Sequence, residues 1–481
     1  MSRARLVVPA LAAAVLAACV SSGDGTPRVA QIAPDSLGLD GPSYVAHPNG
    51  WWTGLGDPQL DRLVSEALSA NPSLAVALAR MRSAEQQANA AGAALSPHVE
   101  FDLNVLRSKV SANYIYPPPY AGSTFWDGRV GFTLTWNLDF WGRQSALIEQ
   151  ATAGARAAEL DAEAAALALS GAVAQTYVDY ARGVALEAVA MHAVRQRDTL
   201  VDLTTRRVSA GIDGETELQL AKSQRSLAGV ALEQARLGRA LASDALAALT
   251  GQSAAAAGEL AAPPRDLHEG LALPAVLPSD LIAHRPDVAA AMARVEAATA
   301  GREAAKAAFY PNVNLVGFGG LTAVGLDALP KGNSQTWSLG PSIHLPIFDA
   351  GRLRAEHARA TADLDAAVAT YNETVLRAIR EASDQVARVR QLDLQLDEQA
   401  RGLEAAERAY ALATQRYEAG IANYLTVITA GTSVTEARRV RANLMADRSL
   451  AGIALVVSLG GGWTGEAAAA RAAYVPMENP K

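Results

Sequence analysis

Two copies of one pattern follow each other along the chain, and this internal repeat limits the folds that the 481 residues can adopt. Residues 71–101 align with residues 285–315 at a constant offset of 214, which places Pro97 on Pro311. Each half then reads as a helix, two strands joined by a loop, a very long helix, a glycine turn and a further helix. We therefore expect one structure built from two similar halves.

Glycines mark the ends of the longest segment in each half. Gly142 matches Gly351 and Gly211 matches Gly420, both at an offset of 209. Because the two segments between these glycines are equal in length, we expect helices that span the same distance. The change in offset falls between residues 107 and 128, where the stretch "YIYPPPYAGS" is typical of a loop.

The repeat also predicts the domain boundaries. We expect a signal peptide at 1–18, a leader at 19–57, the first repeat at 58–250, an insert at 251–284, the second repeat at 285–462 and a C-terminal tail at 463–481.

The long segment of the second half carries a coiled-coil seam. Its apolar residues recur at steps of four and three over about seven heptads, which is a 3.5-residue period. A helix over 350–418 would extend roughly 100 Å at about 1.5 Å per residue. The seam comprises Leu364, Val368, Tyr371, Val375, Ala378, Ala382, Val389, Leu392, Leu396, Leu403, Ala406, Tyr410, Ala413 and Tyr417, with Gln385 and Gln399 at the two remaining positions. The pattern indicates a wall of long helices, and a fibrous stalk is the alternative.

Apolar and polar residues alternate strictly just before the long segment of the first half. In 129–140 one face carries Val130, Phe132, Leu134, Trp136, Leu138 and Phe140. Residues 99–105 alternate in the same way, residues 337–345 do so around Pro341, and the glycine-rich residues 312–320 form the weakest of the four candidate strands.

Such alternation is typical of half-buried sheets in soluble domains and of outer-membrane barrels. Aromatic residues near the strand ends favour the membrane, because they suit an interfacial girdle: Phe125, Trp126, Phe140, Trp141, Trp337 and Phe348. Closed membrane barrels begin at about eight strands, so four strands predict a barrel shared between chains.

The chain's single cysteine, Cys19, follows a segment with the features of a bacterial secretion signal. Arg3 and Arg5 precede an apolar stretch of the usual length. The sequence "LAAC" at 16–19 resembles a lipobox, in which the signal is removed and the new N-terminal cysteine carries lipid. Val20 replaces the aspartate that retains lipoproteins in the inner membrane, so we expect the outer membrane. An ordinary signal peptide with a chance cysteine is the alternative.

Composition and motifs argue against catalysis. A formal charge of −7 gives no basic footprint for nucleic acid, and seven histidines with one cysteine leave little for a metal or thiol site. The sequence has no nucleophile elbow, phosphate loop or zinc spacing. In "HRPD" (284–287), Pro286 suits a first helical turn and Asp287 favours the N-terminal dipole, so we interpret the motif as structural. We expect no enzyme, no metal and no cofactor beyond the lipid on Cys19.

Taken together, four stretches and both "AGI" turns make the chain similar to the TolC-type outer-membrane efflux protein family, in its lipoprotein (NodT-like) branch that serves RND efflux pumps. The stretches are "WWTGLGDPQLDRLVSEALSANPSL", "TWNLDFWGR", "LPSDLIAHRPDVAAAMARV" and "AFYPNVNLVGFGG".

The resemblance implies a mainly α fold with a membrane β-barrel. Three chains with four strands each would close a 12-stranded β-barrel that continues into a long periplasmic α-helical barrel, and the insert 251–284 would form an equatorial belt. It also implies a lipid-anchored protein of the cell outer membrane. The function would be the channel component of a tripartite efflux system, a passive gated exit duct for small toxic compounds or drugs. Its partners would be a periplasmic adaptor (membrane fusion) protein, an inner-membrane RND-type pump and outer-membrane lipid.

The resemblance assigns the glycine turns at 209–214 and 418–423 to hairpin tips that engage the adaptor. The residues that match this pattern are Arg207, Gly211, Arg416, Gly420 and Ile421. Both glycines also suit plain helix capping in the left-handed conformation.

The chain departs from the family just past the second tip. Members often carry a ring of acidic residues there, whereas this chain has Thr426 and Thr429. Tyr424 is then the candidate constricting side chain of a periplasmic gate, and Glu215 and Glu217 on the first tip could supply the negative charge.

Two other functions stay open at this point. A type I protein-secretion conduit would have the same architecture, although the lipobox and "HRPD" favour efflux. A lipid-anchored coiled-coil protein without a pore would share the helical pattern.

Overall fold

The computed structural model describes residues 25–33, 37, 41, 50–253, 260–264, 273–274, 277–278, 281 and 283–463. The signal peptide, Cys19, about half of the leader, much of the insert and nearly all of the tail lie outside these residues. The roles predicted for them stay predictions.

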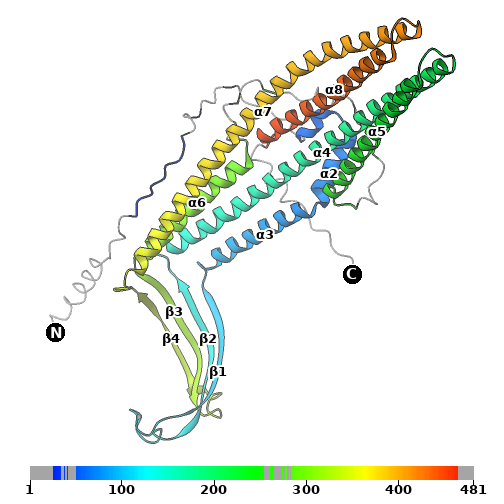
Figure 1. Cartoon of the computed structure of the whole chain (residues 1–481). Coiled ribbons are helices and arrows are strands. Elements are labelled where there is room, and N and C mark those ends of the chain that lie inside the picture. Colours follow the sequence, from blue (N-terminus) through cyan, green and yellow to red (C-terminus); the bar gives the residue numbers. More distant parts are fainter. Residues whose placement is uncertain are drawn as a thin grey trace. The chain divides into compact units, whose positions relative to one another are not determined.

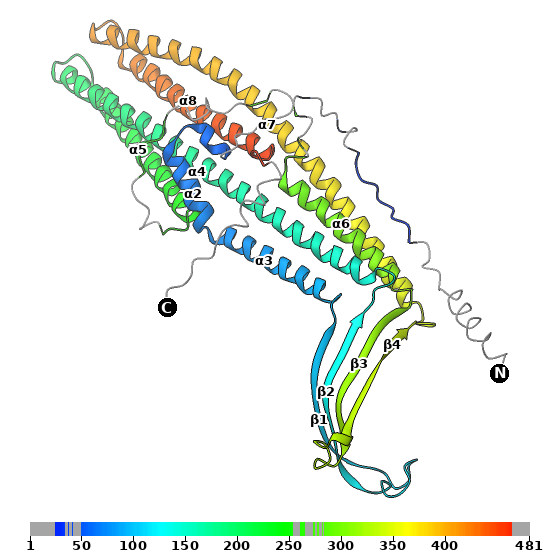
Figure 2. The same cartoon turned by 180° about the vertical axis from the view of Figure 1, so that it is seen from behind.

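Long helices and one four-stranded sheet make up the described chain (Figure 1, Figure 2). In chain order the elements are η2 (Trp51–Leu55), α2 (Pro58–Ala70), α3 (Pro72–Ala93), β1 (His98–Lys109), β2 (Thr124–Asn137), α4 (Arg143–Ser209), α5 (Glu215–Leu249), α6 (Pro286–Ala307), β3 (Asn312–Val324), η3 (Gly332–Ser334), β4 (Gln335–His344), α7 (Arg352–Glu418) and α8 (Tyr424–Ser458). None of the helices within the described ranges has the length and the apolar character that crossing a membrane requires.

Corresponding helices of the two halves have equal lengths. Helices α3 and α6 each contain 22 residues, α4 and α7 each contain 67, and α5 and α8 each contain 35. The expectation of equal long helices is confirmed.

Contacts divide the chain into two compact units, and each unit draws on both halves of the repeat. The sheet unit comprises the described residues of Met1–Gln31, Arg80–Ala158 and Ala290–Asn372. The hairpin unit comprises those of Ile32–Ala79, Glu159–Ala289 and Glu373–Lys481.

The sheet is antiparallel throughout, in the order β1-β2-β3-β4. Phe101 on β1 pairs with Phe132 on β2, and their ring centroids lie 5.5 Å apart. The apolar face of β1 is open, since Val99, Phe101 and Leu103 are 64%, 61% and 63% exposed. The outer edges of β1 and β4 have no strand partner within the described chain.

Strand β3, the weakest of the predicted strands, is as regular as the others and continues to Val324. Its glycines allow close approach to β2. A Cβ added to Gly320 would lie 2.2 Å from the carbonyl oxygen of Val130, and one on Gly131 would lie 2.8 Å from the Phe318 ring. The guanidinium of Arg129 covers that ring at 3.9 Å from its centroid. Glycines that weaken a strand pattern thus make room for an aromatic side chain here.

The strand predicted over 129–140 is too long at its end, because β2 stops at Asn137. Asp139 turns the chain with a φ of 40° and Gly142 with a φ of 71°. The carboxylate of Asp139 accepts hydrogen bonds of 2.8 Å from the backbone N–H groups of Gln144 and Ser145. Leu138 and Phe140 therefore belong to a helix-capping turn and not to the strand.

The second junction has the same construction. Asp349 accepts from the backbone N–H groups of Gly351 at 3.0 Å and Leu353 at 2.9 Å, and Gly351 has a φ of 91°. The two glycines that mark the change of period along the sequence are thus residues with positive φ, where glycine has no steric penalty.

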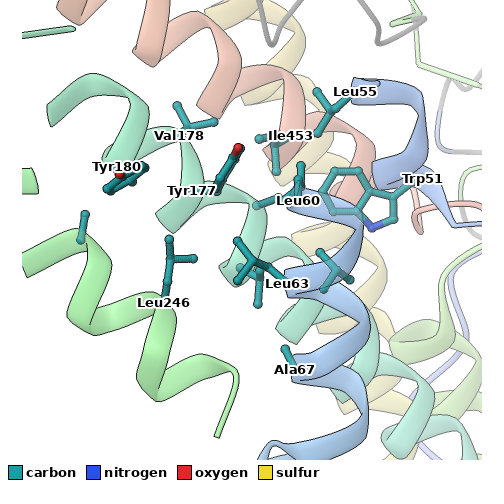
Figure 3. Packing of buried hydrophobic residues seen from close by; sticks show 14 of the residues in the cluster. Trp51, Leu55, Leu60, Leu63, Ala67, Tyr177, Val178, Tyr180, Leu246 and Ile453 are labelled. Carbon is teal, nitrogen blue, oxygen red and sulfur yellow. The ribbon is translucent and has the colours of Figure 1, made fainter. Parts of the chain in front are cut away.

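The largest hydrophobic cluster of the hairpin unit surrounds Tyr177 on α4 (Figure 3). Trp51, Leu60 and Leu63 pack against it from η2 and α2. The Tyr177 hydroxyl donates a 2.5 Å hydrogen bond to Asp57 Oδ2, and Trp51 Nε1 donates to Ser170 Oγ at 3.0 Å. Burial raises the pKa of Tyr177, and the hydrogen bond to Asp57 raises it further.

The predicted seam of α7 is confirmed by burial. Every seam residue is buried or half-buried, and Val375, Ala378, Ala382 and Tyr417 are at most 1% exposed.

The motif "HRPD" has the structural role that the sequence predicts. Pro286 is the first residue of α6, and Arg285 is 7% exposed. Arg285 donates to both carboxylate oxygens of Asp287 at 3.0 and 2.8 Å, to Glu381 at 3.1 Å and to the carbonyl of Ser458 at 2.8 Å. It therefore joins the start of α6 to α7 and to the end of α8.

Candidate functional site at the two hairpin tips

The two hairpin tips lie between α4 and α5 and between α7 and α8, and they share one backbone geometry. Gly211 has a φ of 70° and Gly420 a φ of 71°. The N–H of Ile212 donates to the Arg207 carbonyl at 2.9 Å, and the N–H of Ile421 donates to the Arg416 carbonyl at 2.8 Å. These bonds satisfy helix-end carbonyls, and glycine permits the left-handed turn.

Each turn holds one isoleucine out into solvent. Ile212 is 62% exposed and Ile421 is 71% exposed. An apolar side chain at the end of a hairpin is available for contact with another molecule.

An ion pair on the first tip is joined to the second tip. Arg207 donates to both oxygens of Asp213, with Nε–Oδ2 at 2.8 Å and Nη2–Oδ1 at 3.1 Å. Tyr417 at the end of α7 donates its phenolic hydrogen to Asp213 Oδ2 at 2.6 Å. Arg207 Nη1 also donates to the Tyr417 carbonyl at 3.3 Å, and its guanidinium lies 4.5 Å from the Tyr417 ring centroid. We call these three residues the tip link.

The contacts of the tip link stabilise the charged forms of Arg207 and Asp213. The hydrogen bond from Arg207 lowers the pKa of Asp213, which outweighs the effect of burial, and the hydrogen bond from Tyr417 lowers it further. The hydrogen bond to Asp213 raises the pKa of Arg207. Burial raises the pKa of Tyr417, and its hydrogen bond to Asp213 acts in the same direction. The phenol therefore stays protonated and can donate.

Tyr424, the candidate constricting residue, is buried in the core of the tip in the single chain. It is 3% exposed and packs with Tyr417, Val427 and Ile428, and the two tyrosine rings meet edge to face with centroids 6.2 Å apart. Burial raises the pKa of Tyr424 to about 12. In this conformation Tyr424 supports the tip as part of its core, so a constricting role for its side chain would require it to leave that core.

The other gate candidates lie at the starts of α5 and α8. Glu217 accepts a 3.1 Å hydrogen bond from the backbone N–H of Gly214 and so caps α5. Thr426 donates its hydroxyl to Asn423 Oδ1 at 2.8 Å, and Thr429 donates to the Leu425 carbonyl at 2.8 Å. Glu215 is exposed and accepts from Gln219 at 2.5 Å. Glu215, Thr426 and Thr429 all lie on the surface of the single chain.

The two predicted tip arginines differ although they occupy matching positions. Arg207 is held in the tip link, whereas Arg416 is exposed and forms no side-chain hydrogen bond or ion pair with the described residues. Arg416 is therefore available to a partner, and Arg207 is committed within the chain.

The sequence did not single out Asp213, and it placed Tyr417 only on the seam. A signal for both is present in the comparison of the halves. At the offset of 209, Asp213 matches Ala422 and Tyr417 matches Val208, so the repeat is asymmetric at these two places.

The tips have the chemistry of a contact surface with an internal link. Across the described ranges, no group of three or more His, Cys, Asp and Glu residues could hold a metal ion. In the tip link the charges of Arg207 and Asp213 balance, and the phenol of Tyr417 donates to the same carboxylate. None of the three groups is free to act as a nucleophile or a base.

Known proteins share this architecture. Residues 63–252 and 277–461 match the family described as outer membrane efflux protein. The fusaric acid resistance protein FusA of Burkholderia cepacia is 33% identical over 358 residues, which cover 72% of this chain and 67% of FusA. The putative multidrug resistance outer membrane protein MdtQ of Shigella flexneri is 32% identical over 438 residues, which cover 86% of this chain and 88% of MdtQ.

A solved structure agrees with these relatives. The outer membrane protein VceC from Vibrio cholerae superimposes with a TM-score of 0.79 at 32% identity, over 86% of this chain and 98% of VceC. The predicted fold class, with long helices and four strands in each chain, is confirmed, as are the predicted TolC-type resemblance and the assignment to the outer membrane. The family is one of efflux proteins and not of enzymes. Because the match extends over well more than half of the sequence, this chain belongs to the outer membrane efflux protein family.

Proposed function

We propose that the chain is the outer-membrane channel of a tripartite efflux system, and that it forms a passive gated duct for small toxic compounds. The observation that carries the proposal is the family match over both halves, together with an open sheet whose apolar side chains are exposed. Channels of this family work with an adaptor and a pump. The resistance functions named for FusA and MdtQ support small toxic molecules as cargo.

We propose a homotrimer in which twelve strands close one barrel. The unpaired edges of β1 and β4 support this arrangement, because backbone groups inside a membrane must be paired. Helix α5 supports it too, through a stripe of exposed apolar residues at steps of seven, three, seven and four that suits packing against another helix. The stripe comprises Leu220, Leu227, Val230, Leu237 and Leu241, which are 39–59% exposed.

We propose that the tips meet the periplasmic adaptor through their exposed residues. Ile212 and Ile421 offer apolar contacts, and Arg416 offers an exposed cation that forms no ion pair with the described residues. Gly211 and Gly420 shape the turns that present these side chains. The RND-type pump would then connect to the channel through the adaptor.

We propose that the tip link is a latch of the periplasmic gate. It joins the α4–α5 hairpin to the end of α7, so splaying the two hairpins apart would break it. Glu215, Thr426 and Thr429 would border the entrance from the surface of the tips, with Glu217 capping α5 behind them.

A buried arginine near the tip supports an easily opened gate. Arg197 is 5% exposed, and its described polar partner is the Thr432 hydroxyl at 3.1 Å. Its Nη1 and the hydroxyl of Tyr424 have no hydrogen-bond partner among the described residues. Burial lowers the pKa of Arg197. A buried cation without a carboxylate destabilises the packing around it, so movement of the hairpins would relieve that cost.

We propose lipidation at Cys19 as a second anchor. The described residues 25–31 lie against α6 and α7 of the sheet unit, which supports a leader that follows this unit. The backbone N–H groups of Arg28 and Val29 donate to Asp365 Oδ1 at 2.8 and 3.1 Å, and Arg302 donates to the Gly25 carbonyl at 2.7 Å.

The proposal is tested by recording single-channel currents from the purified full-length protein in planar bilayers. A channel gives discrete conductance steps. A coiled-coil protein without a pore gives none at any applied voltage, even when the tip link is removed by Asp213→Asn. To separate efflux from protein secretion, a deletion strain is tested for sensitivity to small toxic compounds and for loss of a secreted protein.

A further inference from the structure

A cavity of about 170 Å³ lies in the sheet unit, where strands end and long helices begin. It is lined by residues from four places: the end of β2, the start of α4, the link between α6 and β3, and the start of α7. Among its lining residues are Trp141, Arg143, Tyr310, Arg352 and Glu356. A buried water needs about 10–15 Å³ of such space, so the cavity has room for a group of several heavy atoms.

One wall of the cavity is aromatic and continues into exposed apolar surface. The rings of Trp141 and Tyr310 stack at an interplanar angle of 10° with centroids 6.2 Å apart, and Phe140 meets Trp141 edge to face. Phe140 is 67% exposed, and Phe348 at the second junction is 89% exposed. Single side chains this apolar and this exposed suit the boundary between a membrane and water.

The lining also includes one cation, Arg143, that forms no ion pair with the described residues. Asp139 uses both carboxylate oxygens to accept from Gln144 and Ser145. Glu356 accepts from Arg352 at 2.8 Å. Arg143 has no side-chain hydrogen bond or ion pair with the described residues, and it also lines a second cavity of about 200 Å³ beside the first. Of the charged residues that line this cavity (Asp139, Arg143, Arg352 and Glu356), Arg143 is therefore the one whose side-chain donors are free to bind a ligand.

We propose that this cavity binds the phosphate group of a membrane glycerophospholipid, with Arg143 as its cation and the Trp141–Tyr310 wall beside the glycerol and acyl chains. This inference rests on the proposed function, because it places the strand ends at the inner surface of the outer membrane. Arginine suits a phosphate because its planar fork donates two parallel hydrogen bonds to the oxygens. The aromatic wall distinguishes a lipid from free phosphate, which has no apolar part to contact it.

The test is native mass spectrometry of the full-length assembled protein, with dioleoyl phosphatidylglycerol added at fixed concentration. We expect lipid adducts on the wild-type protein, and a roughly tenfold weaker apparent affinity for Arg143→Gln, as loss of one charge-assisted contact predicts. Arg206→Gln, an exposed arginine on α4 outside both cavities, is the matched control and should bind as the wild type does. Dioleoylglycerol, which has the same chains without the phosphate, should give few adducts.

Other outcomes overturn the inference. Equal adducts on wild type and Arg143→Gln would show that the cavity does not hold the phosphate, and equal binding of dioleoylglycerol would show that the phosphate is not recognised. Full competition by inorganic phosphate would identify free phosphate as the ligand. If Arg143→Gln fails to assemble, two other measurements test the inference. They are the lipid affinity of Arg143→Lys, and the comparison of dioleoylglycerol with dioleoyl phosphatidylglycerol on the wild-type protein. An Arg143→Gln protein that conducts normally but has lost the lipid leaves the proposed channel intact, so the two failures are distinguishable.

Discussion

The phenol of Tyr417 donates a 2.6 Å hydrogen bond to Oδ2 of Asp213, although 204 residues separate the two along the chain. The bond connects the end of one 67-residue helix to the turn that follows the other. Arg207 completes the link by donating to both oxygens of the same carboxylate. Three side chains thus hold the two hairpin tips of one chain together.

Removal of the Tyr417 hydroxyl should weaken the contact between the two tips. We expect Tyr417→Phe to weaken the link by about 1–3 kcal/mol, the usual range for a hydrogen bond to a charged group. Cells that make this variant should take up a large hydrophilic antibiotic that the wild-type channel excludes, which is measured as a lower inhibitory concentration. Tyr371→Phe, a buried seam position of α7 outside the hairpin unit, is the control and should leave uptake unchanged. Equal uptake by Tyr417→Phe and wild type would argue against the latch.

The link should respond to pH only in strong acid. Because the pKa of Asp213 is lowered from 3.8 in the folded protein, its contribution is fully present above that value and is lost as the pH falls through the lowered pKa. Bilayer recordings should therefore show a constant closed state between about pH 8 and pH 5, with opening only at pH values below the usual carboxyl range. Asp213→Asn should remove the acid-dependent step. A transition near neutral pH that persists in Asp213→Asn would contradict this assignment.

Equal helix lengths and both turn glycines could be predicted from the sequence because they depend on local pattern. Periods of 3.5 and 2 and a glycine with positive φ leave a signature within a few residues. The tip link has no such signature, since Asp213 and Tyr417 meet only after both long helices have formed. The sequence pattern predicts strand β3 only weakly because glycine has a low strand propensity. In the structure Gly131 and Gly320 make room for the neighbouring strand and the Phe318 ring, and this packing has no signal in a propensity pattern.

Arg416 and Arg207 should behave differently when their charge is reversed. Arg416→Glu should abolish co-purification with the adaptor while leaving trimer yield and conductance unchanged, because Arg416 forms no described side-chain bond within the chain. Arg207→Glu should disturb the tip itself, since it places a carboxylate beside Asp213. If Arg416→Glu binds adaptor as well as wild type does, the second tip is not the contact surface.

Lipidation of Cys19 should not be required for assembly of the trimer. We expect Cys19→Ser to abolish labelling with a radioactive fatty acid and to leave much of the trimer in the outer-membrane fraction, because the barrel would anchor the protein. Cell fractionation and heat-resistant migration in gels measure the two properties. A variant found entirely soluble in the periplasm would show that the sheet does not insert by itself.

Arg285 should contribute strongly to stability. It is buried, and despite the opposing effect of burial its hydrogen bond to Asp287 keeps the pKa of that carboxyl low. Arg285→Ala should destabilise the protein by about 1–3 kcal/mol, because it leaves the half-buried carboxylate of Asp287, 31% exposed, without its charged hydrogen-bond partner. Glu381 is 41% exposed, so solvent screens its share. Thermal melts of this variant beside Arg206→Ala, an exposed arginine, measure the difference, and equal midpoints would exclude the role.

Single-channel conductance of the purified protein tests the central claim most directly. The account predicts discrete steps for heat-resistant trimers, small for wild type and larger, with longer open times, for a variant that carries both Asp213→Asn and Tyr417→Phe. Trimers of the wild type and of this double variant that never conduct at any voltage would contradict the claim that this chain forms a channel.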